Sequence, residues 1–260
     1  MADDRLIIAE GIGKVYHPHD GRESLLQNAL LRLVGRPRRR KWIAALSDVT
    51  FSVQRGEWLA VIGANGAGKT TLLKIIAGIA RPSAGRIEVR APIATQFALG
   101  AGFHPYLSGR ENVFLEGTIL GMTNAEVRTR LTRILDFAGL DAAIDRPVWT
   151  YSVGMVARLG FAVTAYAQPQ LLVLDEALSG GDAAFRDRCD ALFRDLRARG
   201  ATVVVVSHSM KDLVRICDRA LWLERGRVRA EGPTAATISR YQGFVARGGR
   251  EDGAPQPGVQ

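Results

Sequence analysis

Short apolar runs recur along the chain and predict the strands of a sheet. Residues 57–62, 171–174 and 202–206 are apolar almost throughout, as expected of parallel strands buried on both faces. Residues 45–53 alternate between apolar and polar positions like a half-exposed strand. Shorter strands are predicted at residues 6–9, 86–89, 93–96, 220–223 and 227–229.

Helical spacing of apolar residues predicts helices between and beside these strands. Residues 71–77 have this spacing and are followed by Gly78. From residue 97 to residue 167 the chain is helical in character, and Thr123 with Glu126 three residues later has the form of a capping box. Two other helices are expected in this stretch. One begins with residues 109–116, and the other covers residues 153–167.

The segment that joins the strand at 57–62 to the helix at 71–77 is rich in glycine. Residues 63–71 read GANGAGKTT and match the pattern G-x-x-x-x-G-K-[ST] between a strand and a helix. Glycines at Gly63, Gly66 and Gly68 allow positive φ angles and bring backbone N–H groups close to phosphate oxygens.

The start of the following helix favours an anion at the same place. Lys69 is expected to reach the β- and γ-phosphates of a nucleotide, and the Thr70 hydroxyl to bind Mg²⁺. The sequence therefore predicts a nucleotide phosphate site.

Polar side chains follow two of the predicted buried strands. Asp175 and Glu176 come directly after residues 171–174, at the strand end where open parallel sheets bind ligands. Asp175 is expected to hold Mg²⁺ and Glu176 to polarise the water that attacks the γ-phosphate. His208 follows residues 202–206 in the same way and is expected to contact the γ-phosphate and that water. The alternatives are a solvated strand end for the acids and a structural role for the histidine.

A second candidate anion site lies at the start of the helix at 153–167. Ser152 and Gly154 offer a hydroxyl and backbone N–H groups there. An ordinary helix cap has the same composition, and the residues alone leave both possibilities open.

Composition narrows the compartment and the partners. The 260 residues are 47% hydrophobic and carry 35 basic and 26 acidic side chains, a net charge of +9, which suggests a phosphate-rich partner such as nucleic acid or anionic lipid. No apolar run is long enough to span a membrane, and no signal-peptide pattern begins the chain. Cys189 and Cys217 lack metal-ligand spacing and are expected to be reduced thiols, so we expect a chain that is cytosolic or faces the cytosol.

Two segments are predicted to stand apart from this core. Residues 17–42 contain apolar positions at helical spacing and a basic run at 36–41, which suits a helix on a membrane surface or a membrane partner. A helix packed on its own domain is the alternative. Residues 246–260 are rich in Gly and Pro and are expected to form a disordered tail.

These motifs occur together in the order and spacing of an ABC-transporter ATPase, which residues 5–245 resemble. The motifs are the phosphate loop, the turn at residues 152–155, the Asp-Glu strand end, the segment SGGD at 179–182 and His208. The resemblance implies an α/β fold, namely a P-loop NTPase (RecA-like) core with an antiparallel β subdomain and a helical subdomain inserted at residues 97–167. It also implies one ATPase domain over residues 1–245.

The resemblance implies roles for individual residues. ATP and Mg²⁺ are the implied ligands, with Thr70 and Asp175 at the metal and Glu176 and His208 as the catalytic residues. Tyr16 would stack on adenine, although a strand-end aromatic that fills the edge of the core is the alternative. Ser152 and Gly154 would bind the γ-phosphate held by the other copy of a head-to-tail homodimer. Asp182 would lie in a loop that crosses to this partner. The nucleotide-contacting set is Tyr16, Gly63, Asn65, Gly66, Gly68, Lys69, Thr70, Thr71, Gln96, Ser152, Gly154 and Asp182.

One family motif has no clear counterpart. The glutamine at the junction of the core and the helical subdomain corresponds either to Gln96 or, by alignment on residues 104–112, to Leu99. A leucine cannot bind Mg²⁺ or the attacking water, so this role is open here.

Residues 100–112, 151–155 and 175–182 are similar to the subgroup that exports polysaccharides (O-antigen, capsule, teichoic acid), as is the insertion at 17–42. The resemblance implies a peripheral ATPase on the cytoplasmic face of the bacterial inner membrane, with a separate transmembrane permease, acting indirectly on a lipid-linked glycan and without nucleic acid. Some members carry a carbohydrate-binding domain, and we expect none here. The alternatives are an exporter of another lipid-linked substrate and a soluble ATPase that acts on ribosomes or nucleic acid.

Overall fold

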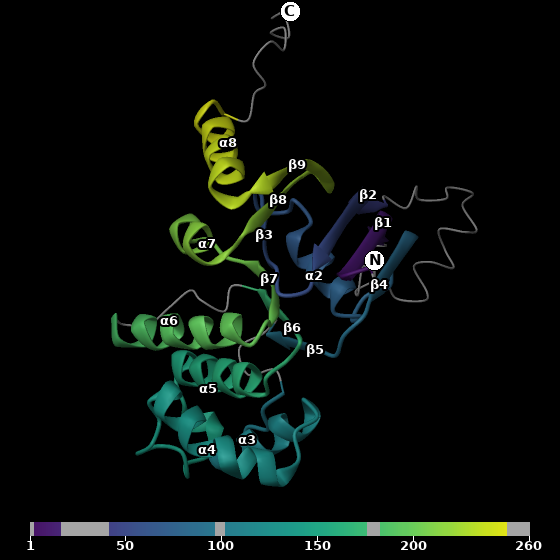
Figure 1. Ribbon diagram of the computed structural model, residues 1–260. Helices are drawn as coiled ribbons and strands as arrows, with labels where there is room; N and C mark the ends of the chain where they lie inside the picture. The colour runs from purple at the N-terminus through teal and green to yellow at the C-terminus, as the bar shows by residue number, and fades with distance from the viewer. Residues whose placement is uncertain (1–2, 17–41, 97–101, 176–182, 249–260) are drawn as a thin grey trace, which may run out of the picture.

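A largely parallel sheet is the centre of the fold. The computed structural model describes residues 3–16, 42–96, 102–175 and 183–248. Within them, six strands pair in the order β5-β6-β7-β3-β8-β9 (Figure 1). The first five are parallel, and β9 is antiparallel to β8. The strands are β3 (Trp58–Ile62), β5 (Ile93–Gln96), β6 (Leu171–Asp175), β7 (Thr202–Val206), β8 (Arg219–Glu224) and β9 (Arg227–Pro233).

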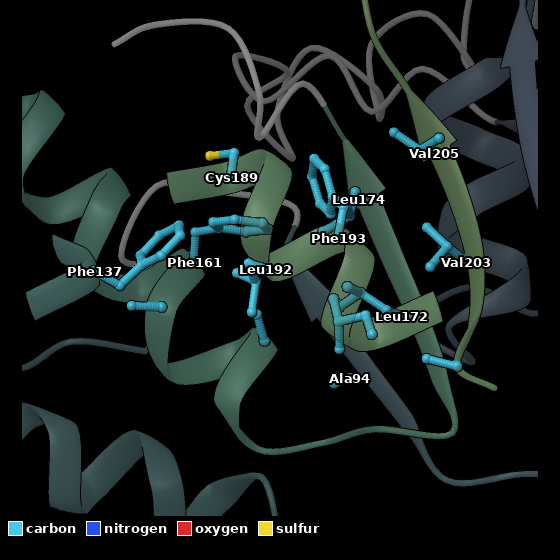
Figure 2. Packing of buried hydrophobic residues seen from close by; sticks show 14 of the residues in the cluster. Ala94, Phe137, Phe161, Leu172, Leu174, Cys189, Leu192, Phe193, Val203 and Val205 are labelled. Carbon is cyan, nitrogen blue, oxygen red and sulfur yellow. The ribbon is translucent and has the colours of Figure 1, made fainter. Parts of the chain in front are cut away.

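The apolar strands are buried on both faces, which confirms the prediction made for residues 171–174 and 202–206. Val203 and Val205 face one cluster of buried side chains, and Val204 and Val206 face another. On the first face the sheet packs against α5 (Val153–Tyr166) and α6 (Ala183–Ala198). Figure 2 shows this packing, with Phe161, Leu192 and Phe193 gathered beside Leu172 and Leu174.

The second face of the sheet is covered by a helix and a smaller sheet. Helix α2 (Lys69–Ile76) contributes Leu72, Leu73, Ile75 and Ile76 to that core. A three-stranded antiparallel sheet in the order β2-β1-β4 lies beyond it. Its strands are β1 (Arg5–Tyr16), β2 (Ile43–Gln54) and β4 (Ala84–Val89). The antiparallel sheet and the parallel sheet therefore share one apolar core around α2.

Helices α3 (Gly109–Ile119) and α4 (Asn124–Ala138) join α5 at one end of the molecule (Figure 1). The predicted capping box is confirmed, since the Thr123 side chain accepts from the backbone N–H of Glu126 and the Glu126 carboxylate accepts from Thr123. Ser108 and Glu111 form a second capping box that was not predicted. The helical character expected after residue 97 is thus confirmed for the described residues.

The structure changes several predicted boundaries. Strand β1 runs from Arg5 to Tyr16 with register shifts along its pairing with β2, where the sequence predicted a strand at 6–9 only. Helices α7 (Met210–Ile216) and α8 (Thr234–Ala246) were not predicted as such, and α8 includes the first residue of the expected tail. Residues 17–41 and 249–260, and with them all of the insertion except Trp42 and most of the tail, lie outside the described residues.

In the described residues, none of the helices is both long and apolar enough to cross a membrane. The same residues contain no group of three or more His, Cys, Asp or Glu placed to hold a metal ion. The two cysteines are buried free thiols, as expected.

Candidate functional site

The carboxyl ends of three neighbouring parallel strands bring the main candidate residues to one edge of the sheet. Strand β7 pairs with β6 on one side and β3 on the other. Asp175 ends β6 opposite Val206, His208 follows the end of β7, and residues 63–68 follow β3. Asp175 and His208 therefore lie at the same edge of the sheet as the phosphate loop.

The backbone of residues 63–68 has the form expected of a phosphate-binding loop. Gly63, Gly66 and Gly68 have φ angles of 148°, 78° and 104°, in the region that favours glycine. Gly68 is the N-cap of α2. Asn65 and Gly66 are exposed at the crest of the loop, and the helix dipole makes this end of α2 favourable for an anion.

Lys69 is the first residue of α2, and its side chain folds over the loop. Its Nζ donates to the carbonyl oxygens of Gly63 at 2.8 Å and Ala64 at 3.0 Å. The Thr70 side chain is exposed beside it and Thr71 is half-buried. The ammonium is therefore held where phosphate oxygens bound by the loop would lie, and the hydroxyl of Thr70 is open to a ligand.

The residues after β6 and β7 differ in exposure. Asp175 is half-buried, whereas His208 is exposed between β7 and α7. Glu176 and Asp182 lie outside the described residues, so their predicted roles stay predictions.

Gln96 ends β5, next to β6, and its side chain faces the interior. It is 6% exposed, and its Oε1 accepts a hydrogen bond from the Thr164 hydroxyl of α5 at 3.1 Å. This contact ties the end of β5 to the helical region. Leu99, the other candidate for the family glutamine position, lies outside the described residues, so the assignment stays open.

Ser152 caps α5, as one of the two sequence interpretations predicted. Its Oγ accepts from the backbone N–H of Met155 at 3.2 Å, and Gly154 is exposed in the first turn. The preceding Tyr151 donates its hydroxyl to the carbonyl oxygen of Ala143 at 2.7 Å, and burial raises the pKa of this hydroxyl. The turn is therefore anchored on one side and open on the other, which is compatible with an anion site in addition to the cap.

Tyr16 ends β1 with 39% of its surface exposed. The Lys14 ammonium lies 5.1 Å from the centre of its ring and donates to the carbonyl oxygen of Arg81 at 2.7 Å. The exposed ring of Tyr16 is available for stacking, and the contact of Tyr16 with adenine stays a prediction.

Sequence reasoning missed the residues that shape the site from behind. The phosphate loop is contacted through backbone atoms by Leu223, Gly226 and Ala45, and backbone contacts leave no side-chain signal.

Asn112 was also missed. It is completely buried, and its side-chain amide nitrogen donates to the carbonyl oxygens of His104 and Leu107 ahead of α3. The residues at helical spacing from Asn112 include Gly109 and Glu116 and form no apolar face, so no sequence signal marks its burial.

Comparison with known proteins identifies the family. The ABC transporter family model matches residues 46–179. The O-antigen export system ATP-binding protein RfbB of Klebsiella pneumoniae is 44% identical over 207 residues, covering 80% of this chain and 84% of the relative. The teichoic acids export ATP-binding protein TagH of Lactococcus lactis is 40% identical over 201 residues, covering 77% of this chain and 43% of the relative.

Solved structures agree with this assignment at the level of the fold. A structure of the ATP-binding subunit of an ABC transporter has a TM-score of 0.73 and 25% identity, and covers 92% of this chain and 94% of the solved one. The dimeric post-hydrolysis ATP-binding cassette MJ0796, bound to ADP and Pi, has a TM-score of 0.71 and 22% identity, with 88% and 98% covered. These neighbours confirm the P-loop NTPase fold expected from the sequence. The matched family model and the relatives above show that the chain belongs to the ABC transporter family.

Proposed function

We propose that this protein is the ATP-hydrolysing subunit of a transporter that exports a lipid-linked polysaccharide. The observation that carries the substrate class is the identity of 44% and 40% to relatives named for O-antigen and teichoic acid export. The phosphate loop with Lys69, and Asp175 and His208 at the same sheet edge, support the ATPase activity.

The chemistry is the attack of water on the γ-phosphorus of ATP. The Lys69 ammonium and the loop N–H groups hold the phosphates and take up negative charge as the bond to the β–γ bridging oxygen breaks. Glu176 accepts the proton of the attacking water, His208 contacts the γ-phosphate, and ADP and inorganic phosphate leave. Tyr16 stacks on the base.

The donors at this edge fit a magnesium ion. Mg²⁺ prefers hard oxygen ligands, and the Thr70 hydroxyl and Asp175 carboxylate provide them on α2 and β6. When bound, the ion neutralises phosphate charge. In this proposal Thr70 and Asp175 would hold the ion, Asp175 either directly or through a water molecule.

Two copies of the chain act together in this proposal. The exposed turn with Ser152 and Gly154 binds the γ-phosphate held by the phosphate loop of a second copy, so that a head-to-tail dimer encloses two nucleotides. Closure on ATP and reopening after hydrolysis are a population shift, which the helical region passes to a separate transmembrane subunit. The ATPase is accordingly peripheral, at the cytoplasmic face of the membrane.

The proposal is tested in the producing bacterium by replacing the gene with Lys69→Ala. We expect surface polysaccharide to be lost and the lipid-linked glycan to accumulate inside the cell. Lys74→Ala is the matched control, because Lys74 lies on the exposed side of the same helix α2. Normal surface glycan in the Lys69→Ala strain, with salt-sensitive recovery of the protein on ribosomes or nucleic acid, would contradict export and favour the soluble ATPase.

The dimer is tested with purified Glu176→Gln protein. We expect this variant to bind ATP, lose nearly all turnover and form a dimer with ATP that light scattering detects. A strictly monomeric Glu176→Gln protein at saturating ATP, also beside its membrane subunit, rules the shared site out. Retention of more than about a tenth of the turnover removes Glu176 from the role of base.

A further inference from the structure

The turn between β8 and β9 lies against the back of the phosphate loop. Its central residues Arg225 and Gly226 have φ angles of 48° and 78°, and Glu224 pairs with Arg227 across the turn, as in a two-residue hairpin of type I′. In Figure 1, β8 lies beside β3, with α2 and β2 close by. The turn is therefore placed where it can act on the loop that follows β3.

Backbone contacts join the hairpin to both ends of the loop. The N–H of Gly226 donates to the carbonyl oxygen of Ala67 at 3.0 Å. At the other end, Gly63 packs so closely on the Leu223 carbonyl oxygen that a Cβ atom there would lie 2.2 Å from it. The hairpin therefore fixes the loop at its first residue and again just ahead of Lys69.

Strand β2 completes the support. The Ser47 N–H donates to the Gly226 carbonyl oxygen at 2.8 Å. The Ala45 carbonyl oxygen is wedged between two glycines, since a Cβ atom on Gly68 would lie 2.6 Å from it and one on Gly226 would lie 2.7 Å from it. The N-cap of α2 and the hairpin turn thus both pack against the Ala45 carbonyl oxygen of β2. Because these contacts are close, we expect a shift of one of the three segments to displace the other two.

The hairpin is itself held rigidly from the far side. Arg229 of β9 forms an ion pair with Glu224, and its guanidinium lies 4.9 Å from the Trp222 ring centre and 4.1 Å from that of Phe244 in α8. Cation–π contacts and an ion pair on one arginine restrict the hairpin arms. The turn is therefore held in place and can limit the movement of the phosphate loop.

We propose that Gly226 is a positioning residue for nucleotide binding: the hairpin turn sets the shape of the phosphate loop, although it touches no phosphate. The inference rests on nucleotide binding by the phosphate loop, as in the proposed function, but not on the exported substrate. A displacement of the loop by about 1 Å changes the distance of every loop N–H donor to the phosphates and so weakens these hydrogen bonds, and misplacements of that size can lower a reaction rate by up to about 100-fold.

The test separates the contact of Gly226 from its φ angle. Asparagine tolerates positive φ, so Gly226→Asn mainly pushes a Cβ atom against Ala45. Gly200→Asn is the matched control, because Gly200 has a φ of 73° and nothing within 4 Å of its Cβ position. We expect the dissociation constant for a fluorescent ATP analogue to rise about tenfold in Gly226→Asn, as the loss of about one hydrogen bond to phosphate would cause, and to change less than twofold in Gly200→Asn. Equal dissociation constants in Gly226→Asn and Gly200→Asn overturn the proposal, whether or not both exceed the wild-type value.

A measurement on the unmodified protein covers the case in which Gly226→Asn fails to fold. We expect ATP to slow hydrogen exchange at the amides of Gly226 and Ser47, which donate within the contact described above, and to leave the amide of Gly200 unchanged. No slowing at Gly226 and Ser47, in protein that binds ATP, overturns the inference and leaves the proposed function intact. Absence of ATP binding by the unmodified protein contradicts the proposed function instead.

Discussion

The parallel strands begin at one edge of the sheet, the amino edge, and end at the opposite one, the carboxyl edge. These two edges are built in different ways. At the amino edge, charged side chains make the contacts: Asp218 accepts from the backbone N–H of Trp58 at 2.9 Å and pairs with Arg197 at 2.8 Å, and Arg219 pairs with Glu57 at 2.6 Å. At the carboxyl edge, the phosphate loop takes its shape from backbone contacts and glycine torsions.

This difference assigns stability to one edge and chemistry to the other. Ion pairs and an aromatic side chain at the amino edge tie the starts of β3 and β8 together, and the parallel register carries this alignment along the strands to their carboxyl ends. A loop with several glycines loses more conformational entropy on ordering, so its shape depends on what surrounds it. We therefore expect substitutions at the carboxyl edge to change nucleotide binding and turnover, and those at the amino edge to change the free energy of unfolding.

The largest effect is expected for Lys69→Ala. In the proposed function the Lys69 ammonium faces the β- and γ-phosphates, so its loss should lower turnover by about 100-fold or more and weaken nucleotide binding. Release of inorganic phosphate and titration with labelled ATP measure the two effects. The thermal midpoint of the nucleotide-free protein should stay close to that of the wild type, with Lys74→Ala as the control for substitution on α2. A turnover within a factor of ten of the wild type would contradict the assignment.

Asp175→Asn and Asp218→Asn compare the two edges with the same chemical change. Asp175→Asn should reduce Mg²⁺-dependent ATPase activity by about 10- to 100-fold, because an amide is a weaker ligand than a carboxylate for a hard cation. Its thermal midpoint should change little. Asp218→Asn should lower the thermal midpoint through its contacts with Trp58 and Arg197 and keep the activity. If the ATPase activity and the thermal midpoint both fell in each of the two variants, the two edges would not differ in role.

Arg197→Ala is expected to act on stability alone. Its guanidinium pairs with Asp218, donates to the Ile216 carbonyl oxygen and lies 4.9 Å from the Trp58 ring centre. The ion pair is about half exposed, so screening reduces its contribution, and we expect the free energy of unfolding to fall by about 1–2 kcal/mol. Denaturant unfolding measures the loss, and the ATP dissociation constant should stay within twofold. Arg194→Ala, on an exposed turn of the same helix, is the control.

The sequence predicted the carboxyl edge better than the amino edge. Continuous valines located β7, and the glycine pattern located the phosphate loop, because burial on both faces and positive φ each select residue types. The network around Asp218 was not predicted, since charges on short connections carry no periodic signal and their partners are far apart in the chain. Gln96 shows the same limit within the site, because its contact with Thr164 depends on how α5 packs on the sheet.

The support of the phosphate loop was the least predictable part of the site. The contacts of Ala45 and Leu223 with the loop glycines use backbone carbonyl oxygens, so any residue with the right backbone position would serve. Only Gly226 left a trace in the sequence, as a glycine between two predicted strands, and a hairpin turn alone would explain it.

The smallest effect is expected at a thiol beside the amino-edge network. Burial, with a smaller contribution from the charge of Asp218, raises the pKa of Cys217 from 9.0 to about 12. Below pH 9 both the folded and the unfolded chain keep this proton. Between pH 9 and pH 12 the unfolded chain loses it and the folded chain does not, so unfolding becomes more favourable as the pH rises. This thiol should therefore remove about 1 kcal/mol of stability between pH 8 and pH 10.

Cys217→Ala isolates that contribution from the titration of every other group. The small cavity it leaves costs the same at each pH, whereas the loss from thiol ionisation occurs only in the wild type. Guanidinium unfolding at pH 8, 9 and 10 should therefore show the stability difference between wild type and variant narrowing by about 1 kcal/mol at the highest pH. Parallel curves would mean that the Cys217 thiol is open to solvent in the folded protein. The amino edge would then be less closed to water than its ion pairs and the buried Trp58 indicate.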